Sequence, residues 1–523
     1  MYDAIIVGSG GAALSAAIEL KLQNKNIVVV TKSSVTSSQT VQAQGGINGV
    51  MNSNDSIESH IADTKKSAHG LFSDKMVEYM CNEAPNIIKW LDTIGVPFNR
   101  DDKEIIDQRK LGGASFNRAN YSSDYTGLKI LHTLYDKARS IGITFIEDAM
   151  LLNLINENDD ICGITYLSLQ DTEVHQILAS NTILATGGYG GVYHNYTTNS
   201  IDTTADGIIA AYNAGANLEN LEMVQFHPTA LKDKFILISE SARGEGGYLV
   251  TKNGERFVDE LLPRDVVARE ITKKLKNEQE VFLDLRHLGK EKILHLMPQE
   301  YKLAHDYLGL KMDQELIPII PACHYSMGGI KVDVTLSTSL NNLYAIGEVS
   351  SSGVHGANRL GGNSLLEIVT FGKKVCYGLE YDFVPEDKEY KITSEDKKKI
   401  DKLLNNDGES LFTIKNNLGQ LMYENVGLFR DETLLSNAND KIEKLNEQFK
   451  QVGIKDKSKI FNMELKQLLE LQNLLICAKL ITKSASLRKE SRGAHYRLDY
   501  QDELSIAQNT IIEKEKGVYF ENN

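Results

Sequence analysis

The sequence predicts an α/β fold in which a nucleotide-binding domain is interrupted by an insertion and followed by a helical domain. Three observations lead to this prediction. The chain opens with an apolar run that ends in a glycine-rich turn, at residues 2–13. Two further apolar runs end in glycine far along the chain, at residues 182–188 and 343–348. From about residue 387 the composition shifts to Lys, Glu, Leu and Asn with helical spacing.

The N-terminal segment predicts a Rossmann-like strand–helix–strand unit with glycines at its first turn. A buried strand at 2–7 precedes the turn, and a helix to about residue 22 and a strand at 26–31 follow it. Gly8 allows the tight turn, and Gly10 lets the backbone approach a pyrophosphate, which the helix N-terminus attracts. NAD-binding proteins use an acidic residue after the second strand. Thr31 and Lys32 stand there instead, which disfavours NAD and leaves FAD open.

The two later glycine junctions predict strands that bring small residues to a cofactor at the carboxyl edge of a parallel sheet. Their distance from the first strand predicts one cofactor-binding domain divided by an insertion. We place the first part of this domain, the insertion, its second part and the C-terminal helical domain at residues 1–230, 231–321, 322–386 and 387–523. In the last region the charge-rich stretch 387–401 is expected to be a linker and a solvated helix face. Helices are expected at 400–404, 418–428 and 462–487.

Composition excludes several classes of function. The chain has 523 residues, 41% of them hydrophobic, which is enough for two or three domains. Its net charge of -14 argues against nucleic acid as a partner. The cysteines are dispersed without a CxxC pair, which argues against an iron–sulfur cluster or structural zinc in this chain and fits a reducing compartment. Without an expected signal peptide or membrane-spanning run, we expect a cytoplasmic protein whose membrane association would be peripheral, through partners.

Three short segments contain the side chains of a candidate anion site, at residues 225–229, 324–325 and 355–359. His227 and His324 occur in loop-like settings rather than on an apolar helix face, and His355 lies close to Arg359. No histidine pair has the short spacing of a metal site, so we expect no bound metal. Together with a nucleotide fold, these segments predict a redox enzyme that acts on a small dicarboxylate.

Two other segments are candidates for proton transfer and cofactor binding. Residues 239–247 place Glu240 and Arg243 within about one helical turn, and Arg264 follows in a second charged segment. Alternating acids and bases could relay protons to a buried site. The alternative is exposed ion pairs, which contribute little to stability. The Gln- and Gly-rich loop at 38–47 could bind the ribityl chain or ring of a flavin, with an ordinary surface loop as the alternative.

Two motifs are specific enough to indicate a family: RGEGG at residues 243–247 and HGANR at residues 355–359. With them the chain resembles the flavoproteins that include succinate dehydrogenase, fumarate reductase and L-aspartate oxidase. The resemblance extends over residues 2–374 and returns at 488–495. It implies a bound FAD, an α+β capping domain over the isoalloxazine, and hydride transfer between flavin N5 and a C4-dicarboxylate.

The resemblance also implies roles for individual residues. The two carboxylates of the substrate would be held by His227, Ser239, His324 and Arg359. Arg264 would exchange the proton on the substrate carbon, and Glu240 and Arg243 would relay that proton to solvent. The FAD would be bound by Gly8, Gly10, Gly11, Ala12, Lys32, Ser38, Thr40, Gln44, Gly45, Gly46, Asp206, Glu348, Asn363, Ser364 and Leu365.

Two positions predict which branch of this family the chain resembles. Members with covalently attached flavin have a histidine where this chain has Gln39, so the FAD is expected to be non-covalent. L-Aspartate oxidases have a glutamate for the substrate's ammonium group where this chain has Leu111, and an apolar side chain cannot satisfy that group. We therefore expect the flavoprotein subunit of a fumarate reductase or succinate dehydrogenase, working with an iron–sulfur subunit.

Two alternatives stay open at this point. The first is an L-aspartate oxidase, which forms iminoaspartate and which the short chain and the segments 83–85, 262–265 and 343–350 favour. The second is a flavin-bound interaction protein without turnover. The intact set of candidate catalytic residues argues against it, because a scaffold needs no proton donor.

Overall fold

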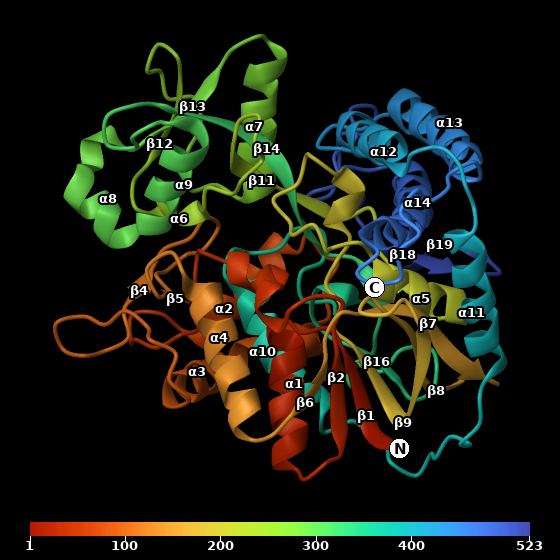
Figure 1. The fold of residues 1–523 in the computed structure, drawn as a ribbon. Coiled ribbons are helices and arrows are strands. Elements are labelled where there is room, and N and C mark those ends of the chain that lie inside the picture. Colours follow the sequence, from red (N-terminus) through yellow and green to blue (C-terminus); the bar gives the residue numbers. More distant parts are fainter. Residues whose placement is uncertain (523) are drawn as a thin grey trace.

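The computed structural model describes residues 1–522. Figure 1 shows a body drawn mainly in red, orange and yellow, in which a large sheet lies between helices. A lobe drawn in green, near residues 231–321, stands above one side of this body (Figure 1). Helices drawn in blue, from the C-terminal region, stand above the other side. The arrangement of sheets and helices confirms the predicted α/β fold class.

Seven strands form the main sheet of the body: β1 (Tyr2–Val7), β2 (Ile27–Val30), β6 (Thr144–Ile146), β7 (Ala149–Glu157), β8 (Asp160–Ser168), β9 (Val174–Leu184) and β16 (Leu343–Ala345). Their order is β6-β2-β1-β9-β8-β7, and β16 pairs with β9. β1 lies parallel between β2 and β9, with Val7 opposite Val30 and Leu184. β16 is also parallel to β9. The three strands that end in glycine are therefore neighbours, and their carboxyl ends meet at one edge.

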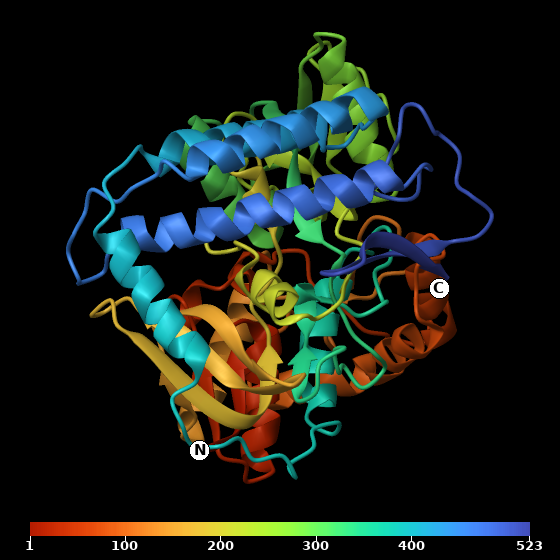
Figure 2. The same ribbon diagram turned by 90° about the vertical axis from the view of Figure 1, so that its right-hand side faces the viewer.

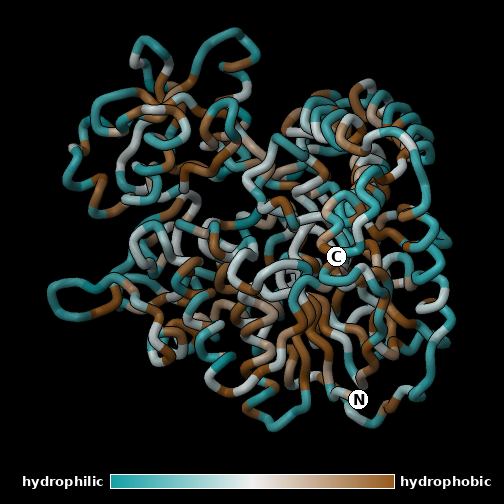
Figure 3. Tube along the Cα trace, in the orientation of Figure 1, coloured by the Kyte–Doolittle hydropathy of each residue, from teal (hydrophilic) through white to brown (hydrophobic). Residues whose placement is uncertain are grey.

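Helices cover both faces of this sheet, which explains why its central strands are continuously apolar. They are α1 (Gly11–Leu22), α2 (Ile57–Ser67), α3 (Asp74–Thr93), α4 (Thr126–Ser140), α5 (Asp206–Ala214) and α10 (Asn363–Val375). α1 packs against α10 and α4 on one face, and α5 packs against β7 on the other. A small sheet of β3 (Ile47–Asn48), β5 (Ala119–Asn120) and β4 (Gln108–Arg109) lies beside them. Figure 3 shows the hydrophobic strands at the centre of the body and hydrophilic segments along its outside.

The lobe has a four-stranded antiparallel sheet of β11 (Val224–Leu231), β14 (Ile317–Ser326), β13 (Val281–Asp284) and β12 (Tyr248–Thr251), in that order. Its helices are α6 (Glu240–Gly244), α7 (Arg264–Lys276), α8 (Lys290–Leu296) and α9 (Pro298–Leu308). Leu249, Val267 and Leu283 belong to a hydrophobic core that is separate from those of the body. The predicted boundary after residue 321 falls inside β14, so this strand is shared by the lobe and the body.

The C-terminal region contains α11 (Lys391–Leu404), α12 (Leu411–Asn425), α13 (Glu432–Phe449) and α14 (Met463–Leu487). Figure 2 shows α12, α13 and α14 packed side by side, with α11 along the main sheet. The prediction of a linker and a solvated helix face at 387–401 agrees with the mostly exposed face of α11, but the helix already begins at Lys391 and buries Thr393, Ile400 and Leu404 along one stripe. The predicted helix at 418–428 begins earlier and ends at Asn425, and α13 was missed. Among residues 1–522, none of the helices has both the length and the apolar character needed to cross a membrane.

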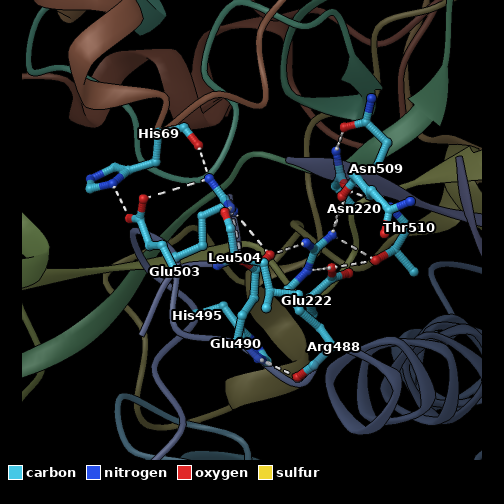
Figure 4. Close-up of polar contacts among 12 residues, drawn as sticks. His69, Asn220, Glu222, Arg488, Glu490, His495, Glu503, Leu504, Asn509 and Thr510 are labelled. Carbon is cyan, nitrogen blue, oxygen red and sulfur yellow. Dashed lines mark hydrogen bonds and ion pairs between the residues drawn. The ribbon is translucent and has the colours of Figure 1, made fainter. Parts of the chain in front are cut away.

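The chain ends in a hairpin that the sequence did not predict. β18 (Gln508–Glu513) and β19 (Gly517–Asn522) extend a sheet of β17 (Ser350–Ser351), β15 (Gly329–Lys331) and β10 (Leu218–Glu219). A buried charged network fixes the preceding segment to the body (Figure 4). In it, Arg488 donates to Glu222 Oε1 at 2.7 Å, to Glu490 Oε1 at 2.8 Å and to Thr510 Oγ1 at 2.8 Å. The C-terminal region is thus tied back into the cofactor-binding part.

Candidate active site

One continuous cavity connects the first turn of the main sheet with the base of the lobe. Gly8, Gly10 and Lys32 line one end of it, and His227, Arg264 and Arg359 line the other. All of the site residues predicted from the sequence line this cavity except Asn363, Arg243 and His355. The fold therefore joins segments from across the chain into a single long site.

The nucleotide end of the cavity is formed by the glycine turn. Gly8 has a φ of 117°, and a Cβ there would overlap the carbonyl oxygen of Ala185 on the neighbouring strand. Gly10 precedes the first turn of α1 and has no side chain to cap it, while the Gly11 N–H donates to Thr40 Oγ1 at 3.1 Å. Gly10, Gly11 and Ala12 line the cavity, and the first turn of α1 has no acidic residue. This geometry suits a pyrophosphate.

Lys32 lies at the same end but is fully engaged by the protein. Its ammonium donates to Asp206 at 2.7 Å, to Glu470 at 2.8 Å and to Thr204 at 2.6 Å. Burial alone would lower the pKa of Lys32, but the carboxylates of Asp206 and Glu470 outweigh it and raise that pKa. Lys32 therefore stays charged, and its role at this edge includes fixing Asp206 at the start of α5.

The polar loop at 38–47 forms the middle of the cavity and is not an ordinary surface loop. Ser38, Gln44 and Gly46 line the cavity. Among residues 1–522, Ser38 Oγ and Gln44 Oε1 are buried and have no hydrogen-bond partner. Leaving such groups unpaired is costly. Because FAD carries polar groups along its ribityl chain and ring edge, these residues fit a bound FAD at this place.

Gln39 is the residue from which we predicted a non-covalent FAD. Its side-chain Oε1 accepts a hydrogen bond from the Ser200 N–H at 2.6 Å, so it braces the loop that precedes α5. Gln39 lines the cavity but offers no nucleophilic nitrogen comparable to an imidazole.

The two later glycine junctions, which follow β9 and β16, contribute to the other wall of the end of the cavity that would hold the cofactor. Glu348, Ser364 and Leu365 line the cavity. Burial raises the pKa of Glu348 to about 7 although its carboxylate accepts from the Ser326 N–H at 2.9 Å. Asn363 is different, because its side chain accepts from Asn48 at 2.7 Å and donates to Thr64 at 2.9 Å, away from the cavity. Only its backbone remains for a cofactor.

Two neutral histidines face each other at the lobe end. The ring centroids of His227 and His324 lie 4.9 Å apart. His227 Nδ1 accepts from the Thr229 N–H at 3.2 Å, and His324 Nδ1 lies 2.8 Å from Thr198 Oγ1, which leaves Nε2 of each ring for other partners. Burial first, and then neighbouring cationic groups including Arg264, hold the pKa of both rings well below the usual value. Both imidazoles are therefore uncharged at neutral pH and can donate a hydrogen bond to an anion.

Arg359 supplies a positive charge beside these rings. Its guanidinium lies 4.2 Å from the centroid of the Tyr325 ring and donates to Ser364 Oγ at 3.0 Å. Burial, followed by repulsion from Arg264, lowers the pKa of Arg359 to about 10, so the group stays charged at neutral pH. Its buried Nε–H has no partner among residues 1–522. His355, expected near this arginine, is turned away and lies 2.7 Å from Glu367 Oε2.

A buried arginine–glutamate–arginine chain leads away from the lobe end. Arg264 donates to Glu240 Oε2 at 2.6 Å, and Arg243 donates to Glu240 Oε1 at 3.2 Å. Burial raises the pKa of Glu240, but the two arginines outweigh it and lower that pKa overall. The interpretation as exposed ion pairs is wrong for these residues, because all three side chains are buried. The spacing in the α6 segment brings Glu240 and Arg243 onto one side of the helix.

Gln225 is hydrogen-bonded to both arginines that line the cavity, although no motif predicted a role for it. Its Oε1 accepts from Arg264 at 3.0 Å, and its Nε2 donates to Asn358 Oδ1 at 2.7 Å and to the Arg359 carbonyl at 2.8 Å. It therefore sets the distance between the two cavity arginines. Its place beside His227 in the chain was the only signal that could have found it. Leu111, which the sequence singled out, is buried and lines the cavity together with Ser239.

Comparison with known proteins agrees with this geometry. A family model described as FAD binding domain matches residues 3–365, and one described as fumarate reductase flavoprotein C-term matches residues 415–518. The mitochondrial succinate dehydrogenase flavoprotein subunit of Oryza sativa is 37% identical over 95% of this chain and 85% of that protein. The 8-methylmenaquinol:fumarate reductase flavoprotein subunit of Wolinella succinogenes is 35% identical over 98% of this chain and 88% of that protein. A solved quinol-fumarate reductase with menaquinol has a TM-score of 0.94 at 33% identity, covering 100% of this chain and 97% of that one.

Proposed function

The chain belongs to the FAD-binding flavoprotein subunits of succinate dehydrogenases and fumarate reductases, and from this we propose how its own residues interconvert succinate and fumarate. A bound FAD supplies the hydride acceptor or donor at its N5. The observation that supports the assignment best is the lobe end of the cavity, where Arg264 lies between Glu240 and Gln225 and shares the cavity lining with His227, His324 and Arg359.

The protein's contribution to binding is a match of charge and hydrogen bonds. Arg359 would bind one carboxylate through its fork of N–H groups, which suits a planar anion. The neutral rings of His227 and His324, together with Ser239, would donate hydrogen bonds to the other. These donors are buried, so their interaction with an anion is stronger than in water.

The protein contributes a path for protons to the proposed reaction. In the direction of fumarate reduction, Arg264 would give a proton to the substrate carbon that does not receive the hydride. Glu240 would return a proton to Arg264, and Arg243 would pass it inward from the far side of Glu240. The contacts Arg264–Glu240 at 2.6 Å and Glu240–Arg243 at 3.2 Å are short enough for these transfers.

Fumarate and succinate suit this cavity better than L-aspartate does. Leu111 lines the cavity where an ammonium group would need an acceptor, and an unpaired buried ammonium is costly. The relatives described above are succinate dehydrogenase and fumarate reductase subunits, and none of them favours an oxidase. The buried proton path likewise distinguishes the chain from a flavin-bound scaffold.

We propose that an iron–sulfur subunit exchanges electrons with this chain. The support is that its relatives carry the name of flavoprotein subunits, and that one solved structure of the family is a quinol-fumarate reductase. Such a partner would hold the chain at the membrane surface, for which we propose the cytoplasmic face. We also propose that the FAD is non-covalent, because Gln39 replaces the histidine of covalent members.

The purified chain reconstituted with FAD allows a direct test. Dithionite-reduced flavin should be reoxidised by fumarate under anaerobic conditions, and oxidised flavin should be bleached by succinate but not by L-aspartate. Flavin released into the supernatant by acid precipitation would show that it is non-covalent. Bleaching by L-aspartate with peroxide formation would instead establish an oxidase.

A further inference from the structure

A pair of buried carboxyl groups joins the lobe to the body next to the proposed catalytic residues. Glu300 lies in the first turn of α9 in the lobe, and Asp124 lies just before α4 in the body. Both side chains are fully buried. Met297 gives α9 no side-chain cap, and the Glu300 N–H instead donates to Asp124 Oδ2 at 2.9 Å. A carboxylate of the body thus caps a helix of the lobe.

Glu300 also supports the residue that would bind substrate. Its Oε1 accepts from the Ser239 N–H at 3.1 Å. The Ser241 hydroxyl lies 3.2 Å from the same oxygen and 2.9 Å from Ser239 Oγ. The backbone and the side chain at the start of α6 are therefore both fixed from behind by Glu300, while Ser239 faces the cavity.

The charges around the pair do not balance if both carboxyl groups are ionised. Arg109 of β4 is the cation that faces them, and its other neighbours are Tyr121 and Glu245. Arg109 donates to the carbonyls of the polar loop at 2.8 and 2.9 Å, and its Nη1 has no partner among residues 1–522. Glu300 Oε2 and Asp124 Oδ1 are also without a partner in this range. One proton on the pair would bring the summed charge of Glu300, Asp124 and Arg109 to zero. It would also supply a hydrogen-bond donor to these oxygens.

We propose that Glu300 is a positioning residue, which with Asp124 and one shared proton seats the lobe on the body and holds Ser239 at the substrate end of the cavity. This inference rests on the proposed role of Ser239 in binding the dicarboxylate. Ionisation of both carboxyl groups leaves an unbalanced buried charge at the contact between lobe and body. That contact therefore loosens, and dicarboxylate binding weakens, when the pair loses its proton.

The direction of the pH dependence follows from proton binding in the seated and the opened states. Burial and the charge of Asp124 raise the pKa of Glu300 from 4.5 to about 8 in the seated state, and burial raises the pKa of Asp124 to about 6. The seated state therefore binds the proton more tightly than a solvated Glu300 does. The stabilisation of the contact is complete below about pH 4.5 and is lost as the pH rises to about 8.

Malonate is a suitable probe, because it is a dicarboxylate with a single methylene carbon and cannot be dehydrogenated between two carbons. Its dissociation constant for the FAD-reconstituted chain is measured from the change in flavin absorbance at about pH 6 and about pH 9. We expect the wild type to bind at least about tenfold more weakly at the higher pH. Glu300→Gln keeps an acceptor for Ser239 and cannot ionise, so its affinity should differ by less than about threefold between the two conditions.

Two further variants separate positioning from general damage. Glu300→Ala removes the acceptor and should bind about tenfold more weakly than the wild type at both pH values, with recovery in Glu300→Gln. Glu291→Gln changes an exposed glutamate of the same lobe and should match the wild type. Amide exchange, corrected for its intrinsic pH dependence, should increase in residues 231–321 of the wild type at the higher pH but not in Glu300→Gln.

The outcomes distinguish this inference from the function on which it rests. No malonate binding by the wild type at either pH contradicts the proposed dicarboxylate site itself. Binding whose pH dependence is the same in the wild type and Glu300→Gln overturns the role of Glu300 alone. If Glu300→Ala fails to retain FAD, the comparison of the wild type with Glu300→Gln still decides whether Glu300 causes the pH dependence of malonate binding.

Discussion

Two buried groups of arginines and glutamates differ in how their charges are balanced. The Arg488 cluster (Arg488, Arg492, Glu222 and Glu490) pairs two guanidinium groups with two carboxylates. Every guanidinium nitrogen in it donates a hydrogen bond within the protein. The cavity cluster (Arg243, Arg264, Arg359 and Glu240) places three guanidinium groups around one carboxylate. In it, Nε of Arg243 and of Arg359 has no partner among residues 1–522.

The difference fits the proposed roles, in which the Arg488 cluster holds the fold and the cavity cluster binds a ligand. The formal charges of the Arg488 cluster balance, and it fixes the C-terminal region to the body. Of its carboxylate oxygens, Glu222 Oε2 has no hydrogen-bond partner among residues 1–522. The cavity cluster has two positive charges in excess, which is the charge that a dicarboxylate would neutralise. Burial lowers the pKa of Arg243 and Arg359, which is a cost to folding that a stability network would not need. Such local conflicts are typical of functional sites.

The largest expected effect comes from removing the proposed proton donor of the cavity cluster. Arg264→Ala should lower fumarate reduction by about 10²–10⁴-fold while FAD stays bound, because general acid catalysis contributes this much. The measurement is anaerobic reoxidation of reduced flavin by fumarate. Lys273→Ala, at an exposed position of the same helix, should retain full activity. Near-normal turnover in Arg264→Ala would contradict the proposed role.

Removing the central residue of the Arg488 cluster should affect stability instead of catalysis. Arg488→Ala leaves Glu222 and Glu490 buried without their shared cation, which costs about 3–5 kcal/mol. Urea unfolding followed by circular dichroism measures the change, and turnover per bound FAD should stay close to that of the wild type. Arg286→Ala breaks a solvent-exposed pair in the lobe and is expected to unfold at the wild-type urea concentration. A strong loss of turnover in folded Arg488→Ala would show that the two clusters are coupled.

One arginine-to-lysine substitution in each cluster should distinguish the roles of the two clusters more precisely. Arg359→Lys keeps the charge but loses the fork of N–H groups, so the KM for fumarate should rise about 10–100-fold with little change in stability. Arg492→Lys should lower the unfolding midpoint and leave the KM unchanged, because its N–H groups serve only the fold. Steady-state kinetics and urea unfolding of both variants provide the test. If both variants change the KM for fumarate, or both change the unfolding midpoint, the division into a ligand-binding and a structural cluster is wrong.

The smallest expected effect is stabilisation by a dicarboxylate. Malonate at a concentration of about 100 times its dissociation constant should raise the thermal unfolding midpoint by a few degrees, which corresponds to about 2.7 kcal/mol. Arg488→Ala should show the same upward shift from its lower starting point, and Arg359→Ala should show almost none. A shift in Arg359→Ala as large as in the wild type would mean that malonate binds elsewhere.

Local patterns were sufficient for the features that depend on a few consecutive residues. The strand at Tyr2–Val7 and the glycine turn after it were predicted correctly, because apolar periodicity and glycine spacing are properties of the segment itself. The α11 helix shows the limit of that approach. Its charges predicted a linker and a solvated helix face, but the buried stripe through Ile400 became recognisable only against the main sheet.

The site residues also divide into those that a local motif predicts and those that only the packing reveals. His227, Arg264 and Arg359 were found from motifs, and all three line the cavity. The side chain of Asn363 could not be oriented from the motif, because the packing of α10 against α2 turns it away. No local pattern pointed to Gln225 or Glu300, because their contacts are with residues distant in the chain.

The sequence by itself determined the α/β fold class, the FAD turn and the kinds of side chain that can grip a dicarboxylate. It also singled out Gln39 and Leu111, from which we predicted a non-covalent FAD and a site without an acceptor for an ammonium group. Only the tertiary structure decided which charges are balanced and which polar atoms stay unpaired. The physical reason is that burial and pairing depend on long-range packing, so the neighbours of an arginine in the chain do not reveal whether its guanidinium lies beside carboxylates or beside other cations.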